Sequence, residues 1–199
     1  MKIKFLLAPV LALGMAATAA VPAEAASKVP TKTITEIVAA SGGDFDRNRY
    51  DFDILLNAVL AANLQGALAD TSKQFTVFAP NDQAFMRTAR DLGFTGSGEQ
   101  ATWDFLVGAL TDLGGGDPIP VLTNILLYHV APVSLNPFQV VFSRHIDTLL
   151  GQSFGVRGIV LVDKDPDIRN PFLNLFNLNI KASNGRIHAI TRVLIPVNL

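Results

Sequence analysis

The sequence contains no cysteine among its 199 residues. This absence excludes disulfides, thiol catalysis, iron–sulfur clusters and thiolate zinc sites, so packing alone must stabilise the fold. A surplus of either charge is also missing, since 16 Lys and Arg accompany 17 Asp and Glu for a formal net charge of −1. A near-neutral chain has no electrostatic attraction for phosphate backbones, so we expect no nucleic-acid partner. Hydrophobic residues are abundant, at 49%, which suits one domain with a sizeable core.

The first 25 residues predict an export signal rather than part of the fold. Lys2 and Lys4 give a short positive start, and an uncharged, alanine-rich stretch follows as far as Glu24. Ala23-Glu24-Ala25 has the small residues that flank a signal-peptide cleavage site. The alternative is an uncleaved membrane anchor, because the uncharged stretch is almost long enough to cross a bilayer, but alanine is weakly apolar for that role.

The remainder of the chain has no internal repeat and no run of like charge. We therefore predict a signal peptide over residues 1–25, a linker over 26–32 and a single domain over 33–199. The style of the signal is bacterial, so we expect a secreted or periplasmic protein with no membrane span after cleavage.

Residue spacing predicts helices through the first two thirds of the chain. Apolar residues recur at intervals of three and four, as on one face of a helix, and polar caps or glycines bound several of the stretches. A short strand at 75–78 interrupts them, and Asn81 follows it as the expected N-cap of the next helix. The helical stretches are 31–40, 52–64, 82–86, 103–113 and 118–131.

After Pro137 the sequence changes to short runs of β-branched and other apolar residues that are typical of strands. Asn184-Gly185 predicts a tight hairpin turn between the last two strands, because both turn positions need a positive φ. Helices first and strands later indicate an α+β fold rather than an alternating α/β fold. The expected strands are 146–150, 154–156, 159–162, 173–180 and 187–195.

Four segments resemble, in the same order, the signature elements of the fasciclin domain family. They are residues 75–85 (FTVFAPNDQAF), 127–130 (LYHV), 146–151 (IDTLLG) and 183–196 (SNGRIHAITRVLIP). The resemblance implies a fasciclin-type β-wedge of short strands with the N-terminal helices packed over it. It also implies a non-enzymatic extracellular module that adheres to cell-surface or matrix proteins, to polysaccharide or to another copy of itself.

The adhesive motifs of that family are only partly present. In its vertebrate matrix members, a Tyr-His pair and a later Asp-Ile pair are tied to integrin binding. Tyr128-His129 matches the first pair, but Asn179-Ile180 stands in place of the second, so we expect no integrin partner. All four residues remain candidates for binding another partner. Residues 42–51 and 86–117 depart from the family pattern, and such loops commonly determine specificity.

Residues with catalytic potential have simpler structural explanations. We interpret His129 as a buried histidine near a helix C-terminus and His188 as part of a buried strand, while His145 should be exposed. No two histidines have the spacing of zinc ligands. Gly151-Gln152-Ser153-Phe154-Gly155 matches the nucleophile-elbow pattern, but strand residues follow where the elbow requires a helix. We therefore predict no catalytic residue and no enzymatic activity.

Two acidic stretches place oxygen ligands at alternate positions, the spacing that calcium-binding loops use. Both lack the glycine and the distal glutamate of an EF-hand loop, so solvated turns are the simpler interpretation, and calcium is the one cofactor considered. The candidate ligands are Asp163, Asp165 and Asp167 in one stretch and Asp44, Asp46 and Asn48 in the other.

Phenylalanine is the dominant aromatic, with 13 residues against two tyrosines and one tryptophan. Most of these rings should fill the core. Phe138, Phe142, Phe172 and Phe176 fall in loop-prone stretches, and exposed together they would form an apolar patch or cleft. An alternative function is therefore a carrier of an apolar small molecule, a carotenoid or lipid, held between helix and sheet.

Overall fold

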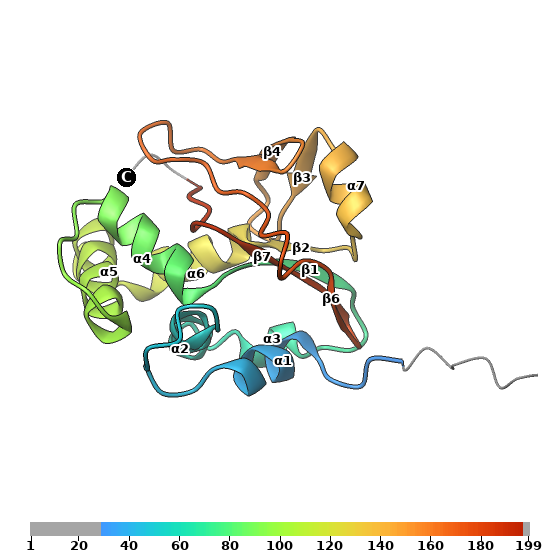
Figure 1. The fold of residues 1–199 in the computed structure, drawn as a ribbon, viewed down its shortest axis with the longest axis horizontal. Coiled ribbons are helices and arrows are strands. Elements are labelled where there is room, and N and C mark those ends of the chain that lie inside the picture. Colours follow the sequence, from blue (N-terminus) through green and yellow to red (C-terminus); the bar gives the residue numbers. More distant parts are fainter. Residues whose placement is uncertain (1–28, 197–199) are drawn as a thin grey trace, which may run out of the picture.

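The computed structural model describes residues 29–196 and is shown in Figure 1. The predicted signal peptide and part of the predicted linker lie outside this range. No helix within residues 29–196 is long and apolar enough to cross a membrane. The helices are α1 (Ile34–Ser41), α2 (Asp53–Ala61), α3 (Gln65–Leu68), α4 (Asp82–Asp91), α5 (Glu99–Leu113), α6 (Ile119–Tyr128) and α7 (Pro137–Phe142). The strands are β1 (Phe75–Pro80), β2 (Val130–Ala131), β3 (His145–Asp147), β4 (Ser153–Arg157), β5 (Val160–Val162), β6 (Ile180–Ala182) and β7 (Gly185–Ile190).

Side-chain caps fix where several helices begin. The predicted N-cap Asn81 is confirmed, because its side chain accepts a hydrogen bond from the Ala84 N–H. Thr33 and Asn136 each form a capping box at the start of α1 and α7. The helix predicted to end at 131 instead ends at Tyr128, since the next residues form β2 and pair with β1.

The strands form two separate sheets. β1 and β7 are the central, parallel pair of a four-stranded sheet with the order β2-β1-β7-β6, and the outer pairs are antiparallel. The second sheet is antiparallel, with the order β3-β4-β5. In Figure 1 this small sheet lies above the four-stranded sheet, α1 to α3 lie below it, and α4 to α6 lie to one side. The arrangement is the α+β architecture that the sequence predicts.

The core consists of two apolar clusters on opposite faces of β1. Because side chains alternate along a strand, Phe75 and Val77 join the larger cluster with α1, α2 and α6, whereas Phe78 joins the smaller one. In the smaller cluster Phe78 and Tyr128 both pack edge-to-face against Phe154, with ring centroids 5.2 and 5.8 Å apart. Aromatic packing therefore joins the two sheets to the end of α6.

The predicted strand at 173–180 is wrong for most of its length. Leu173 forms a single bridge with β7, and β6 begins only at Ile180. Between them the chain turns at Asn174, whose side chain accepts a backbone hydrogen bond two residues on, and Asn179 adopts a positive φ of 65°. Asparagine side chains form local hydrogen bonds that compete with a strand ladder, and asparagine tolerates the left-handed region. The apolar residues between these asparagines nevertheless give the segment the sequence pattern of a strand.

The hairpin between β6 and β7 is confirmed, but its turn lies one residue earlier than predicted. Ala182 pairs with Gly185, so Ser183 and Asn184 are the turn residues. Gly185 has a φ of 147°, and a Cβ there would lie 2.0 Å from a carbonyl oxygen of β1. Glycine is therefore required for the close approach of β1. The Asn184 side chain instead accepts from the first N–H of α1 and donates to the last carbonyl of α3.

The predicted strand at 187–195 ends at Ile190, and a segment without a strand partner follows it. Three consecutive N–H groups of this segment, at residues 193–195, donate to side chains from three different parts of the fold. The acceptors, in that order, are Thr88 Oγ1 at 3.0 Å, His129 Nε2 at 2.9 Å and Asp163 Oδ2 at 2.9 Å. The segment is thus held by polar side chains rather than by a ladder.

Candidate functional site

His129 is buried at the C-terminal end of α6, as predicted. Its Nδ1 lies 2.7 Å from the Ile125 carbonyl oxygen, and its Nε2 accepts from the Leu194 N–H at 2.9 Å. A carbonyl can only accept and an N–H can only donate, so these partners fix the neutral tautomer with hydrogen on Nδ1. Burial lowers the pKa of His129 to about 4. The residue is therefore a neutral structural link at physiological pH.

Tyr128 is also fully buried, and its hydroxyl donates to the Ser153 carbonyl at 3.3 Å. Burial raises the pKa of the Tyr128 hydroxyl above its ordinary value, so the group stays protonated. Because neither Tyr128 nor His129 reaches the surface, a partner would contact the residues that cover this pair and not the pair itself.

Asn179 and Ile180, the other two partner-binding candidates, are half-buried. Asn179 Oδ1 accepts from the Arg186 guanidinium, and the Asn179 N–H donates to His188 Nδ1 at 3.1 Å. The Nε2 of His188 lies 2.9 Å from the Leu135 carbonyl, and burial lowers the pKa of this histidine. His188, on a buried central strand as predicted, thus joins the segment before α7 to the segment before β6.

The four phenylalanines considered in the sequence analysis lie on α7 and on the segment before β6, close in the chain to the two residues that contact the His188 ring. Phe138, Phe142 and Phe176 are 76%, 79% and 97% exposed, and Phe172 is 40% exposed. The rings of Phe138 and Phe142 are stacked on α7, with centroids 6.3 Å apart. We call these four residues, one pair on α7 and one pair in the segment before β6, the phenylalanine surface. Large exposed aromatic side chains of this kind are typical of interaction sites.

Ser153 lies in a strand and not on a nucleophile elbow. It is the first residue of β4 and pairs with Asp147 of β3, so the helix that an elbow requires does not follow it. His145, which we expected to be exposed, lies on the outer face of β3.

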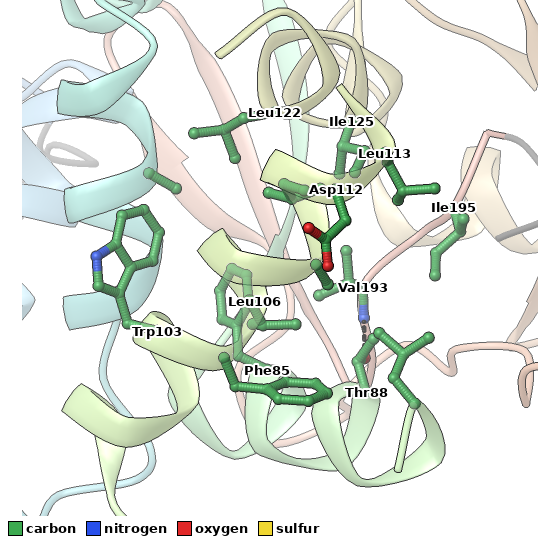
Figure 2. Close-up of a pocket in the computed structure, with 15 residues that line it drawn as sticks. Phe85, Thr88, Trp103, Leu106, Asp112, Leu113, Leu122, Ile125, Val193 and Ile195 are labelled. Atoms are coloured by element: carbon green, nitrogen blue, oxygen red, sulfur yellow. Dashed lines mark hydrogen bonds between the residues drawn. The ribbon is translucent and has the colours of Figure 1, made fainter. Parts of the chain in front are cut away.

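An apolar cavity of about 310 Å³ opens among the helices and the segment that follows β7. Figure 2 shows Phe85, Trp103 and Leu106 on one part of its wall and Val193 and Ile195 on another, with Asp112 as a carboxylate among them. Its volume is at the lower end of the range for small-molecule sites. The alternative function placed an apolar ligand between helix and sheet, whereas this cavity is lined by α2, α4, α5, α6 and the terminal segment.

The acidic stretch at 163–167 uses its carboxylates as backbone acceptors. Asp163 accepts from the Ile195 and Asp165 N–H groups, and Asp165 in turn accepts from two N–H groups that follow it. Burial raises the pKa of Asp163 to about 6. Asp167 is exposed, and these three carboxylates do not gather within 4.8 Å of one another.

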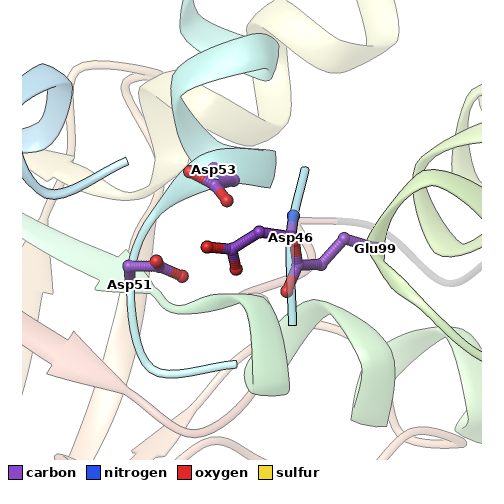
Figure 3. Close-up of side chains that lie close together, drawn as sticks. All are labelled: Asp46, Asp51, Asp53 and Glu99. Atoms are coloured by element: carbon purple, nitrogen blue, oxygen red, sulfur yellow. The ribbon is translucent and has the colours of Figure 1, made fainter. Parts of the chain in front are cut away.

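The other acidic stretch contributes one residue to a cluster of four carboxylates that was not predicted from the sequence. Asp46 lies with Asp51, Asp53 and Glu99 so that one oxygen of each is within 4.8 Å of the others. Figure 3 shows their carboxyl groups converging from the loop before α2, the start of α2 and the start of α5. We call these four residues the acidic cluster. Asp44 is not among these carboxylates, whereas Asn48 contacts two of them, since its backbone N–H donates to Asp46 and its side-chain amide donates to Asp51.

Comparison with known proteins gives consistent matches. The fasciclin domain model matches residues 50–196. The protein sll1483 of Synechocystis is 28% identical over 170 residues, which cover 85% of this chain and 78% of that protein. The solved FAS1 domain pair from the insect cell adhesion molecule Fasciclin I aligns with a TM-score of 0.56 and 16% identity, over 84% of this chain and 52% of that chain. The chain thus spans about half of that structure, whose likeness confirms the predicted fold class.

Proposed function

Since the chain belongs to the fasciclin domain family, we propose that it is an exported, non-enzymatic adhesion module that binds through its phenylalanine surface. Fasciclin domains are adhesion-type modules and are typically extracellular. The partner is a cell-surface or matrix protein or a second copy of the chain. Polysaccharide is less suited to this surface, because phenylalanine offers no hydrogen bond to sugar hydroxyls.

The observation that carries the proposal is the high exposure of Phe138, Phe142 and Phe176, which are 76%, 79% and 97% exposed. Burying one such ring against a partner contributes about 1.5–3 kcal/mol of favourable free energy. Four exposed rings therefore give the protein a strong tendency to associate. The motif residues Asn179 and His188 link the segment before β6 to the segment before α7, because the His188 ring contacts the Asn179 N–H on one side and the Leu135 carbonyl on the other. Their role in binding is therefore to position the exposed rings.

The test is adhesion of beads coated with the purified domain, to each other and to cells of the organism that produces it. Phe138→Ser combined with Phe142→Ser should reduce adhesion about tenfold or more, the loss typical of interface hot spots. Leu60→Ser is the matched control, because Leu60 is 51% exposed on α2, on the opposite side of the four-stranded sheet in Figure 1. Unchanged adhesion of the double variant, with its melting temperature preserved, would contradict the proposal.

A second candidate function, carriage of an apolar small molecule such as a lipid or carotenoid, is favoured by the cavity beside α5. A volume of about 310 Å³ suits a small ligand or one end of a longer one. Trp103 lines the cavity and is the only tryptophan of the chain, so its fluorescence should change when a fatty acid binds. Ala109→Phe, which fills the cavity, should abolish that change, whereas Gly108→Ala, with open space around its Cβ, should not.

A further inference from the structure

We propose that the acidic cluster binds one calcium ion, which ties the loop before α2 to the start of α5. The cluster is separate from the phenylalanine surface and from the apolar cavity, and its members come from positions up to 53 residues apart in the chain. Three independent features support the assignment: unpartnered buried oxygens, uncompensated charge and the spacing of the ligand atoms.

The first feature is a set of carboxylate oxygens that are buried without a hydrogen-bond partner. Asp53 and Glu99 are only 1% and 2% exposed, and Asp53 Oδ2 and Glu99 Oε1 have no donor. The second oxygen of each is held by the backbone, since Asp53 accepts from the Gly43 N–H and Glu99 from the Asp46 N–H. Asp51 Oδ1 is buried and unpartnered as well. A buried acceptor without a donor is unfavourable, and a bound cation would satisfy all three.

The second feature is the absence of a compensating positive side chain. Within residues 29–196 the ion pairs join Lys73 to Asp70 and Arg192 to Asp91, and neither involves the cluster. Four converging carboxylates with no positive partner repel one another, and a divalent cation removes that repulsion.

The third feature is the size and chemistry of the site. Calcium takes about six to eight oxygen ligands in flexible geometry, whereas magnesium usually binds one or two carboxylates and keeps several waters, so four converging carboxylates suit calcium. One oxygen of each of the four carboxylates lies within 4.8 Å of the others, close enough for a single ion to contact all four. Asp46 is exposed, which leaves one side of the cluster open for water molecules to complete the coordination.

Calcium binding is tested by thermal unfolding of the purified domain at about pH 8, with a chelator or with about 10 mM calcium. Extracellular calcium modules have dissociation constants of about 0.1–1 mM, so the melting temperature should rise by roughly 3–10 °C. Glu99→Gln should abolish this rise and should raise the melting temperature in chelator, because it removes one repelling charge. Asp104→Asn, an exposed carboxylate on the same helix, is the matched control and should retain the full rise.

Terbium luminescence gives a second readout that does not depend on any variant. Trp103 lies one turn of α5 after Glu99 and should sensitise a terbium ion bound in the cluster. Added calcium should displace the terbium and quench the signal. The proposal is overturned if calcium leaves the wild-type melting temperature unchanged, if Glu99→Gln keeps the rise, if magnesium gives an equal rise, or if calcium fails to quench the terbium signal.

Discussion

His129→Phe should separate the structural role of the buried histidine from its pH dependence. The substitution keeps an aromatic ring of similar shape but leaves the Leu194 N–H and the Ile125 carbonyl without partners. Each buried unpaired group costs about 1–3 kcal/mol, so the variant should be less stable than wild type by about 3 kcal/mol at pH 7.5. That difference corresponds to a fall in melting temperature of about 6–12 °C for a domain of this size.

The difference between the two proteins should shrink on acidification. The pKa of His129 is lowered from 6.5 to about 4 in the folded state, so its stabilisation is complete above pH 6.5 and is lost as the pH falls toward 4. One pKa unit corresponds to about 1.4 kcal/mol, which gives a total loss of about 3 kcal/mol, of which about 2 kcal/mol has occurred by pH 5. The phenylalanine variant has no such group to protonate.

Urea unfolding followed by circular dichroism at several pH values measures this difference directly. We expect the free energy of unfolding of His129→Phe to be lower than that of the wild type by about 3 kcal/mol at pH 7.5 and by about 1 kcal/mol at pH 5, and we call this difference the gap. The contributions of His188 and of the carboxylates cancel, because both proteins contain them. His145→Phe, at an exposed histidine, is the control and should leave the gap near zero at both values. A gap for His129→Phe that stays constant or widens on acidification would refute the reasoning.

Three further substitutions test other buried polar and backbone features. Burial, together with the neighbouring Asp51 carboxyl, raises the pKa of Asp82 from 3.8 to about 8, so its contribution to wild-type stability should fall as the pH rises from about 4 to about 8 and should not change above that. Asp82→Asn should flatten that decline in melting temperature between about pH 4 and pH 8, and a decline parallel to that of the wild type would contradict the assignment. Asn184→Ala leaves α1 and α3 with unpaired backbone groups and should lower the free energy of unfolding in urea by about 2–3 kcal/mol, whereas a loss below about 0.5 kcal/mol would count against this. Gly185→Ala forces a Cβ against β1 and should abolish the cooperative melting transition, while Gly66→Ala, with open space around its Cβ, should keep it.

Local signals were sufficient to predict most of the elements from the sequence. Asn81 caps α4, and β1 lies where its β-branched and aromatic residues indicated, because both signals act over a few residues. The strand expected at 173–180 failed since its apolar residues were not opposed by a continuous partner, which only the tertiary fold decides. The predicted turn of the last hairpin is one residue too late because the close approach of β1, and not the turn geometry, requires glycine at Gly185.

The candidate sites were predicted less completely, because they depend on residues that are distant in the chain. Asp46 was identified as a ligand candidate, and Asp51 and Asp53 repeat the same alternate spacing a few residues on, a signal that could have been followed. Glu99 has no such signal, since only the packing of α5 against α2 and α4 brings it to the cluster. The sequence allows the four phenylalanines either to fill the core or to be exposed together, and only the fold decides between these alternatives.

The terminal segment explains why several residues that suggest chemistry have structural roles. Its N–H groups cannot form a ladder, so a hydroxyl, an imidazole and a carboxylate accept from them instead, and all three acceptors are consumed by the backbone. The same segment supplies Val193 and Ile195 to the wall of the apolar cavity. Protonation of His129 at Nε2 would remove the hydrogen bond from the Leu194 N–H. The cavity wall formed by Val193 and Ile195 would then be held less firmly. The stability of the segment and the integrity of the cavity therefore depend on the same hydrogen bonds.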